Sequence, residues 1–231
     1  MAVTKRLIWD KVGEREYETG TSKGVLFTQD TAGAYSEGIA WNGLVSVTQS
    51  PDGAEANDQF ADNIVYVSLT SAENFKGNIS AFTYPDEFGA CDGSADVVPG
   101  VTIGQQTRQP FAMSYQTIVG NDTLGNDFGK KIHVIYGAKV APSERGYETV
   151  NADPSLITFS WDFTTTPVVL ENFKPTAYIA IDSTKVNPAI FKAVEDAIYG
   201  TETVASKLPP LEDLIKLIKT TSTTTTTTKA V

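Results

Sequence analysis

The stretch from Trp41 to Thr83 constrains the fold most, because it holds two strand-forming runs separated by a long acidic segment. The runs at 43–48 and 63–69 are rich in β-branched and aromatic residues, which favour strands. The segment between them, 49–62, is far longer than a tight hairpin turn needs, and connections of this length are commonly functional or disordered. We therefore expect a long loop that docks on another subunit, with a merely solvated loop as the alternative.

The expected loop has a distinct composition. It carries several acids and no Lys or Arg, and its one large apolar residue, Phe60, is expected to be buried. A buried aromatic side chain among acids is what a docking segment would use. The residues assigned to docking are Gln49, Pro51, Asp52, Glu55, Asp58, Phe60 and Asp62.

Strand signals dominate the rest of the chain. Alternation of apolar and polar residues over 157–164 predicts a strand with one face in the core. The runs at 111–119 and 131–136 predict paired strands joined by a loose hairpin loop at 120–129. Shorter signals predict strands at 24–27, 75–84 and 176–181, a turn of helix at 85–91, and a loop at 92–110.

Helix signals come only late in the chain. Asn187 can cap, Pro188 suits a first turn, and Gly200 suits a stop, so an apolar stripe between them predicts a helix over 188–199. A shorter stripe beginning at Leu211 predicts a second helix, which should need a partner surface. The Thr-rich end follows, and we expect 223–228 to form either a floppy tail or an extended strand added to a neighbouring subunit.

These signals predict a mainly β chain of the α+β class, arranged as a sandwich or partial barrel. Residues 1–208 would form the main domain, including the flanking helix at 188–199. Residues 209–231 would form an extension, made of a short C-terminal helix and the Thr-rich tail.

The charge balance limits the choice of partner. The chain has 18 basic and 28 acidic residues, a net charge of −10, which argues against gripping nucleic acid by its phosphates. It is compatible with a surface that DNA passes without sticking. The single cysteine, Cys91, allows no internal disulfide, and neither a signal peptide nor a bilayer-spanning segment is evident, so we expect cytosolic synthesis and no membrane partner.

Catalytic signals are weak. The only histidine, His133, lies on the strand face opposite Ile132, Val134 and Tyr136, so we expect it to be exposed or at an interface. No zinc-binding or nucleophile motif accompanies it, and the Asx-rich segments are better explained as turns than as calcium loops. We expect no catalytic residue, metal or cofactor; a hydrolase using His133 stays a distant alternative.

Seven short sequence phrases occupy residues 9–20, 24–27, 40–44, 61–64, 82–88, 99–106 and 132–137. Together, and in this order, they resemble the major tail proteins (tail tube proteins) of long-tailed, non-contractile bacteriophages and prophages of Gram-positive bacteria. The likeness extends over about 4–210, and the Thr-rich end beyond Lys219 falls outside it.

The resemblance implies a structural subunit with a tail-tube-type β-sandwich and a flanking helix. Six copies would form a ring, and rings would stack into a tube around a tape-measure protein, between tail terminator and distal tail proteins. DNA would later pass through the bore, with Asp62 and Glu73 as candidate bore-facing acids. The 49–63 segment would reach the adjacent ring. Localisation would be the virion, after assembly in the host cytoplasm.

An alternative hypothesis assigns a different function to the same fold class. A β-sandwich module that binds carbohydrate or another cell-surface ligand would use exposed aromatic side chains such as Tyr35 or Tyr147. It would stay monomeric or form a small oligomer, whereas a tube subunit must assemble.

Overall fold

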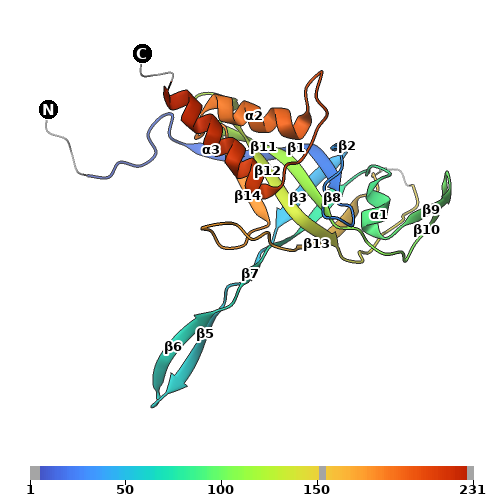
Figure 1. The fold of residues 1–231 in the computed structure, drawn as a ribbon, viewed down its shortest axis with the longest axis horizontal. Helices are drawn as coiled ribbons and strands as arrows, with labels where there is room; N and C mark the ends of the chain where they lie inside the picture. Colours follow the sequence, from blue (N-terminus) through green and yellow to red (C-terminus); the bar gives the residue numbers. More distant parts are fainter. Residues whose placement is uncertain (1–5, 151–154, 228–231) are drawn as a thin grey trace.

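A computed structural model describes residues 6–150 and 155–227, with backbone only for 223–227. The chain is mainly β, with one large antiparallel sheet, three small hairpin sheets and a few helices, which confirms the predicted class (Figure 1). The order of the large sheet is β2-β1-β11-β12-β13-β8-β3, with β14 also paired to β12. Its strands are β1 (Glu16–Thr28), β2 (Ile39–Trp41), β3 (Leu44–Gln49), β8 (Lys76–Ala81), β11 (Phe111–Asn121), β12 (Gly125–Val140), β13 (Phe159–Thr165) and β14 (Tyr178–Asp182).

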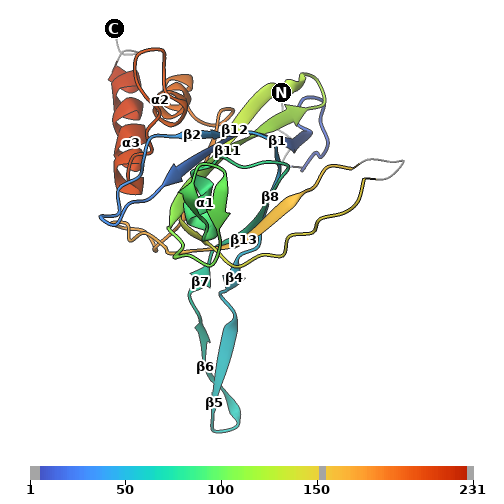
Figure 2. The same cartoon turned by 90° about the vertical axis from the view of Figure 1, so that its right-hand side faces the viewer.

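The large sheet curls into a partial barrel. Its two end strands, β2 and β3, are consecutive in the chain and are separated only by Asn42 and Gly43. Such a short link requires the two ends of the sheet to approach each other, and a Cβ added at Gly24 of β1 would lie 3.2 Å from Leu44 of β3. Figure 2 shows the resulting curve, with helix α1 (Phe88–Asp92) against its inner face.

Alternation along the strands divides the core between the two faces of this sheet. On β12, Ile132, Val134 and Tyr136 pack into an outer cluster beneath two helices, whereas Ile135 joins an inner cluster. The inner cluster holds Trp161 with the α1 residues Phe88 and Cys91, among others. Both faces of the central strands are therefore covered.

Helix α2 (Pro188–Tyr199) has the bounds that the sequence predicts. The side-chain Oδ1 of Asn187 accepts a hydrogen bond from the backbone N–H of Ala189 at 2.9 Å, and this satisfies one of the free donors of the first turn. Gly200 ends the helix at a φ of 75°, a conformation that glycine adopts without strain.

Helix α3 (Leu211–Thr227) is longer than expected and corrects the prediction for the Thr-rich end. Residues 223–227 are helical and not an extended strand; Thr228 lies outside the described residues. The hydroxyls of Thr220, Thr221 and Ser222 each donate to the carbonyl four residues earlier, so the helix itself satisfies them. Leu211 packs in the same outer cluster as α2, and the proposed boundary at 208/209 stays a prediction.

Several predicted loops are also wrong. The 120–129 loop is a tight turn between β11 and β12, because the side chain of Asn121 accepts from the backbone N–H of Leu124 at 2.6 Å and holds the chain in place. The 92–110 segment contains a hairpin of β9 (Ala95–Val98) and β10 (Val101–Ile103). Ile157, expected in a strand core, precedes β13 and is 42% exposed.

Candidate functional site

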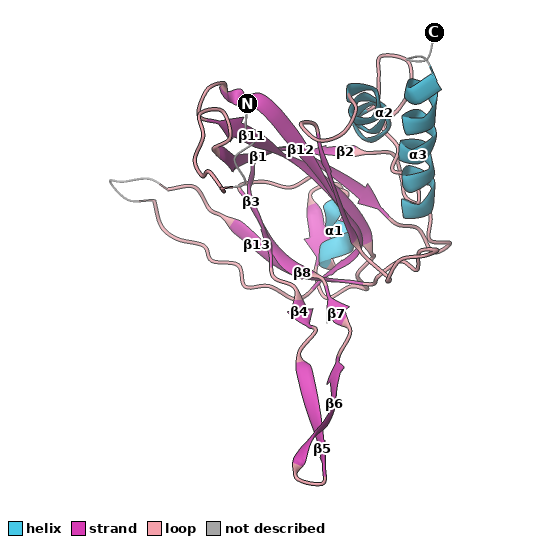
Figure 3. Ribbon diagram, turned by 90° about the vertical axis from the view of Figure 1, so that its left-hand side faces the viewer, coloured by secondary structure: helices cyan, strands magenta, loops and turns pink. Residues whose placement is uncertain are grey.

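The acidic segment that we expected to be a loop is one strand of a projecting hairpin. A short stem pairs β4 (Asp52–Gly53) with β7 (Glu73–Asn74), and an outer arm pairs β5 (Ala56–Ala61) with β6 (Ile64–Thr70). The expected partner strand at 43–48 instead becomes β3 and pairs with β8 in the body. We call residues 52–74 the projecting hairpin; Figures 2 and 3 show it leaving the body at the end away from α2 and α3.

The turn explains why a long loop is not needed. Asp62 and Asn63 both have positive φ, 52° and 63°, and connect β5 directly to β6. Two central residues with positive φ form the tight turn whose twist matches a hairpin, and Asn and Asp tolerate this conformation better than other non-glycine residues. A bulge between Gln59 and Phe60 adds local twist to the arm.

The residues assigned to docking therefore follow one strand of this hairpin. Asp52 lies in the stem, Glu55 between the stem and the arm, Asp58 and Phe60 in β5, and Asp62 in the turn. Two others lie outside the hairpin. Pro51 precedes the stem, and Gln49 belongs to β3, where its side-chain Nε2 donates to the Tyr115 hydroxyl at 2.6 Å.

The arm exposes its apolar side chains instead of burying them. Phe60, expected to be buried, is 71% exposed, and Tyr66 is 75% exposed. The same is true of the other large apolar residues of β6, which are Ile64, Val65, Val67 and Leu69. A two-stranded hairpin without a covered face is marginal in water, and burying one such side chain fully stabilises by roughly 1.5–3 kcal/mol. A partner surface would therefore stabilise this arm substantially.

The charge of the hairpin is of one sign. From Gln49 to Asn74 the chain has five acids and neither Lys nor Arg. At the base, Lys76 of β8 forms an ion pair with Asp52, and this ammonium group lowers the pKa of the carboxyl. The two candidate bore-facing acids lie at opposite ends of the hairpin, Asp62 at the tip and Glu73 in the stem. Their orientation toward a bore stays a prediction.

A second polar site surrounds His133 and corrects its expected exposure. The side chain lies on the predicted face but is buried at 5% exposure, with its ring stacked on Tyr115 at 4.6 Å between centroids. Its Nδ1 lies 2.6 Å from the hydroxyl oxygen of Tyr178, and its Nε2 lies 3.1 Å from a carboxylate oxygen of Glu18. Burial lowers the pKa of His133, although the Glu18 charge acts in the opposite direction.

The groups around His133 do not form a triad. The Thr117 hydroxyl lies 2.8 Å from Nε2, the same ring nitrogen that contacts Glu18, whereas Nδ1 faces a tyrosine hydroxyl. A catalytic carboxylate would have to orient the histidine from the nitrogen opposite the nucleophile. Burial raises the pKa of Glu18, but the hydrogen bonds from Lys131 and Thr117 more than offset this, so the net shift is downward. The cluster is thus a polar network on the wall of an open hollow of about 510 Å³, which Glu18, Lys131 and His133 help to line.

Other candidate sites offer less. Among the described residues, no group of three His, Cys, Asp or Glu side chains could hold a metal ion. Tyr35, expected to be exposed, is half-buried, and its hydroxyl accepts from the backbone N–H of Gly137 at 3.1 Å; Tyr147 is 71% exposed. Within 6–150 and 155–227, no helix is long and apolar enough to cross a membrane.

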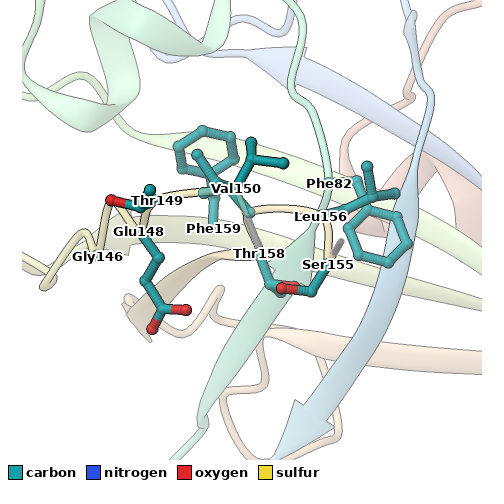
Figure 4. Close-up of a pocket in the computed structure, with 10 residues that line it drawn as sticks. Phe82, Gly146, Glu148, Thr149, Val150, Ser155, Leu156, Thr158 and Phe159 are labelled. Atoms are coloured by element: carbon teal, nitrogen blue, oxygen red, sulfur yellow. The ribbon is translucent and has the colours of Figure 1, made fainter. Parts of the chain in front are cut away.

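A hollow of about 720 Å³ lies between two stretches of the same surface loop (Figure 4). Val150 and Leu156 border it from the loop, and Phe82 borders it from the body. Its described lining comes from both sides of 151–154 in the sequence, and we assign no ligand to it.

Comparisons with known proteins add no family. No protein-family model matches the chain, and no curated protein matches it. The features that bear on function are therefore the resemblance of the sequence phrases and the geometry of the projecting hairpin.

Proposed function

We propose that this protein is the structural subunit of a bacteriophage tail tube, which assembles into stacked hexameric rings and forms the conduit for DNA. The observation that carries the proposal is the projecting hairpin, whose large apolar side chains lie exposed on an arm that none of the described residues of the body covers. An arm of this kind gains stability only when it docks, and the resemblance implies that a second ring is the partner.

The edges of the sheet support assembly by the same chain. Among the described residues, β3 pairs only with β8, and β14 pairs only with β12, so each leaves one edge without a strand. Exposed edges invite pairing with another chain, and closing a ring of subunits is one way to remove them. The body can therefore supply contacts within a ring while the hairpin supplies contacts between rings.

The charge supports a conduit. The net charge of −10, and a hairpin whose charged residues are all acidic, would repel phosphates. DNA would therefore slide past and not adhere. The tape-measure, terminator and distal tail proteins follow from the resemblance and belong to the same proposal.

Electron microscopy of the purified chain over a range of concentrations tests the proposal. Rings or hollow tubes are the expected result. A protein that stays monomeric at every concentration, and that is missing from phage particles produced by the host, would contradict it and favour a surface-binding module that uses aromatics such as Tyr147.

A further inference from the structure

A second apolar surface lies on the helical side of the body. A groove of about 430 Å³ runs between α3, the edge strand β14 and the segment before that strand. Among the described residues, the charged side chains of its lining are Lys174 and Lys219. We call it the α3 groove; its apolar lining residues are Leu170, Phe173, Tyr178, Ile179, Leu211, Ile215 and Ile218.

The groove and the projecting hairpin are complementary in chemistry. The hairpin offers exposed apolar side chains such as Phe60 and Tyr66, and all of its charged residues are acidic. The groove offers apolar walls, and the charged residues of its described lining are lysines. An adjoining hollow shares Lys219 with the groove and adds Glu171 and Glu212 together with Lys216. The charges that complement the acidic hairpin are therefore those of Lys174 and Lys219 in the groove lining.

We propose that the α3 groove receives the projecting hairpin of a second copy of this chain. This inference rests on the proposed function and names the receptor surface for its docking arm. The groove cannot receive its own hairpin, because the stem fixes the hairpin in a direction away from α2 and α3 (Figures 2 and 3). The stem is held by β4–β7 pairing and by a 2.8 Å hydrogen bond from the Ser50 N–H to the Lys76 carbonyl.

The contact has a consequence for assembly. Hairpin and groove are different surfaces, so a docked pair of copies still has one free hairpin and one free groove for further copies. Heterologous contacts of this kind propagate until a ring closes or a filament extends. One contact repeated between rings would therefore lengthen a tube without a second type of interface along its axis.

Site-directed photo-cross-linking tests the contact. Tyr66→Cys places a thiol near the tip of the arm, where the side chain is exposed and the fold does not depend on it. The native Cys91 is fully buried, and burial raises the pKa of its thiol to about 12, so a benzophenone maleimide should modify only the introduced cysteine. The labelled variant is mixed with ¹⁵N-labelled unmodified protein, irradiated, digested and mapped by mass spectrometry.

The expected cross-links join the hairpin to ¹⁵N peptides from 168–179 or 211–219. Links to the N-terminal segment, where Leu7 and Trp9 are also exposed, to another hairpin or to the curled sheet would overturn the inference. Links within one chain would overturn it as well. A matched probe at Leu124, exposed on the β11–β12 turn, should give no links to the α3 groove.

A pair of surface substitutions makes the test independent of the probe. Phe173→Glu places a charge in the groove, and we expect it to reduce the cross-link yield at least about tenfold. Val169→Glu, four residues earlier and outside the groove lining, is the matched control and should leave the yield within about twofold. Equal yields from both variants would overturn the inference.

The outcomes separate the two proposals. Tubes seen by electron microscopy, with cross-links that avoid the groove, would overturn the receptor surface and leave the tube function standing. Cross-links to the groove in protein that forms only short oligomers would support the receptor surface and weaken the tube function. A protein that stays monomeric at every concentration, gives no intermolecular cross-link and is missing from phage particles produced by the host would overturn both.

Discussion

Two hairpins of this chain are built alike and end in opposite environments. The β11–β12 hairpin and the β5–β6 arm both pair antiparallel strands across a tight turn. The first is covered on both faces over Ile132–Tyr136, by helices outside and by the inner cluster within, whereas every residue of β5 and β6 is exposed. Apolar residues on both faces of a strand indicate two covering layers, and for the arm the described chain supplies neither.

The largest expected effect comes from removing the arm. Replacing residues 56–70 by Asn-Gly keeps the stem and supplies a tight turn between Glu55 and Ser71, which already share a 3.3 Å backbone hydrogen bond. We expect rings to fail to stack, because the docking surface is gone. Electron microscopy and light scattering measure assembly, and urea unfolding should show the monomer unchanged within about 1 kcal/mol. Tubes of normal length from this variant would remove the arm from the proposed function.

The same substitution placed in each hairpin sharpens the comparison. Ile132→Ala opens a cavity in a fully buried position of β12 and should cost about 2–5 kcal/mol of unfolding free energy. Ile64→Ala acts on a side chain that is 63% exposed and should change the monomer by less than about 0.5 kcal/mol. Chemical denaturation measures both. Equal costs would mean that the arm packs on its own body in solution.

The buried β12 hairpin should also respond to mild acid through His133. Burial holds the folded pKa of His133 below the ordinary imidazole value of about 6.5, so the unfolded chain binds a proton that the folded chain does not as the pH falls below about 6.5. Stability is then lost toward low pH, by at most about 1.4 kcal/mol per pH unit. Urea unfolding between about pH 7.5 and 5.5 should show a steeper loss for the native protein than for His133→Gln. Parallel curves would contradict this assignment.

The smallest effect concerns the turn of the arm. Asn63→Gly replaces a residue at a φ of 63° by one that adopts this conformation without strain, and should order the arm slightly. Amide hydrogen exchange in β5 and β6 should slow by about twofold to threefold, while global unfolding stays the same within about 0.5 kcal/mol. Faster exchange would show that the Asn63 side chain itself stabilises the turn.

Local signals predicted local structure well. Asn187, Pro188 and Gly200 gave the bounds of α2, because a cap, a first-turn proline and a terminal glycine act within a few residues of the chain. The prediction of an extended strand in the Thr-rich end was wrong for a related reason. Threonine favours strands in general. In α3, however, the hydroxyls of residues such as Thr221 donate to backbone carbonyls of the preceding turn, and Leu211 packs the start of the helix against the outer cluster.

The location of the projecting hairpin was predicted from the composition of the sequence, but its hairpin structure was not. β5 consists largely of residue types that are depleted in strands. The turn after it, Asp62–Asn63, lacks the glycine that marks most tight hairpins. Only the pairing with β6 therefore reveals that β5 is a strand. His133 was placed on the correct face, yet its burial depends on Glu18 and Tyr178, which come from strands distant in the sequence. Contacts of that kind leave no local pattern.

The hairpin also defines a path for mechanical load. β3 and β8 continue through the β4–β7 stem into the arm, and β8 is held on its other edge by β13. Because β3 and β8 enter the stem at the same end, a pull along the arm draws both strands in the same direction. Hydrogen bonds between antiparallel strands lie perpendicular to the strands, so this pull loads the bonds between β8 and β13 together and not one at a time. A force applied at the tip therefore enters the body as shear, which is the direction in which a sheet yields last.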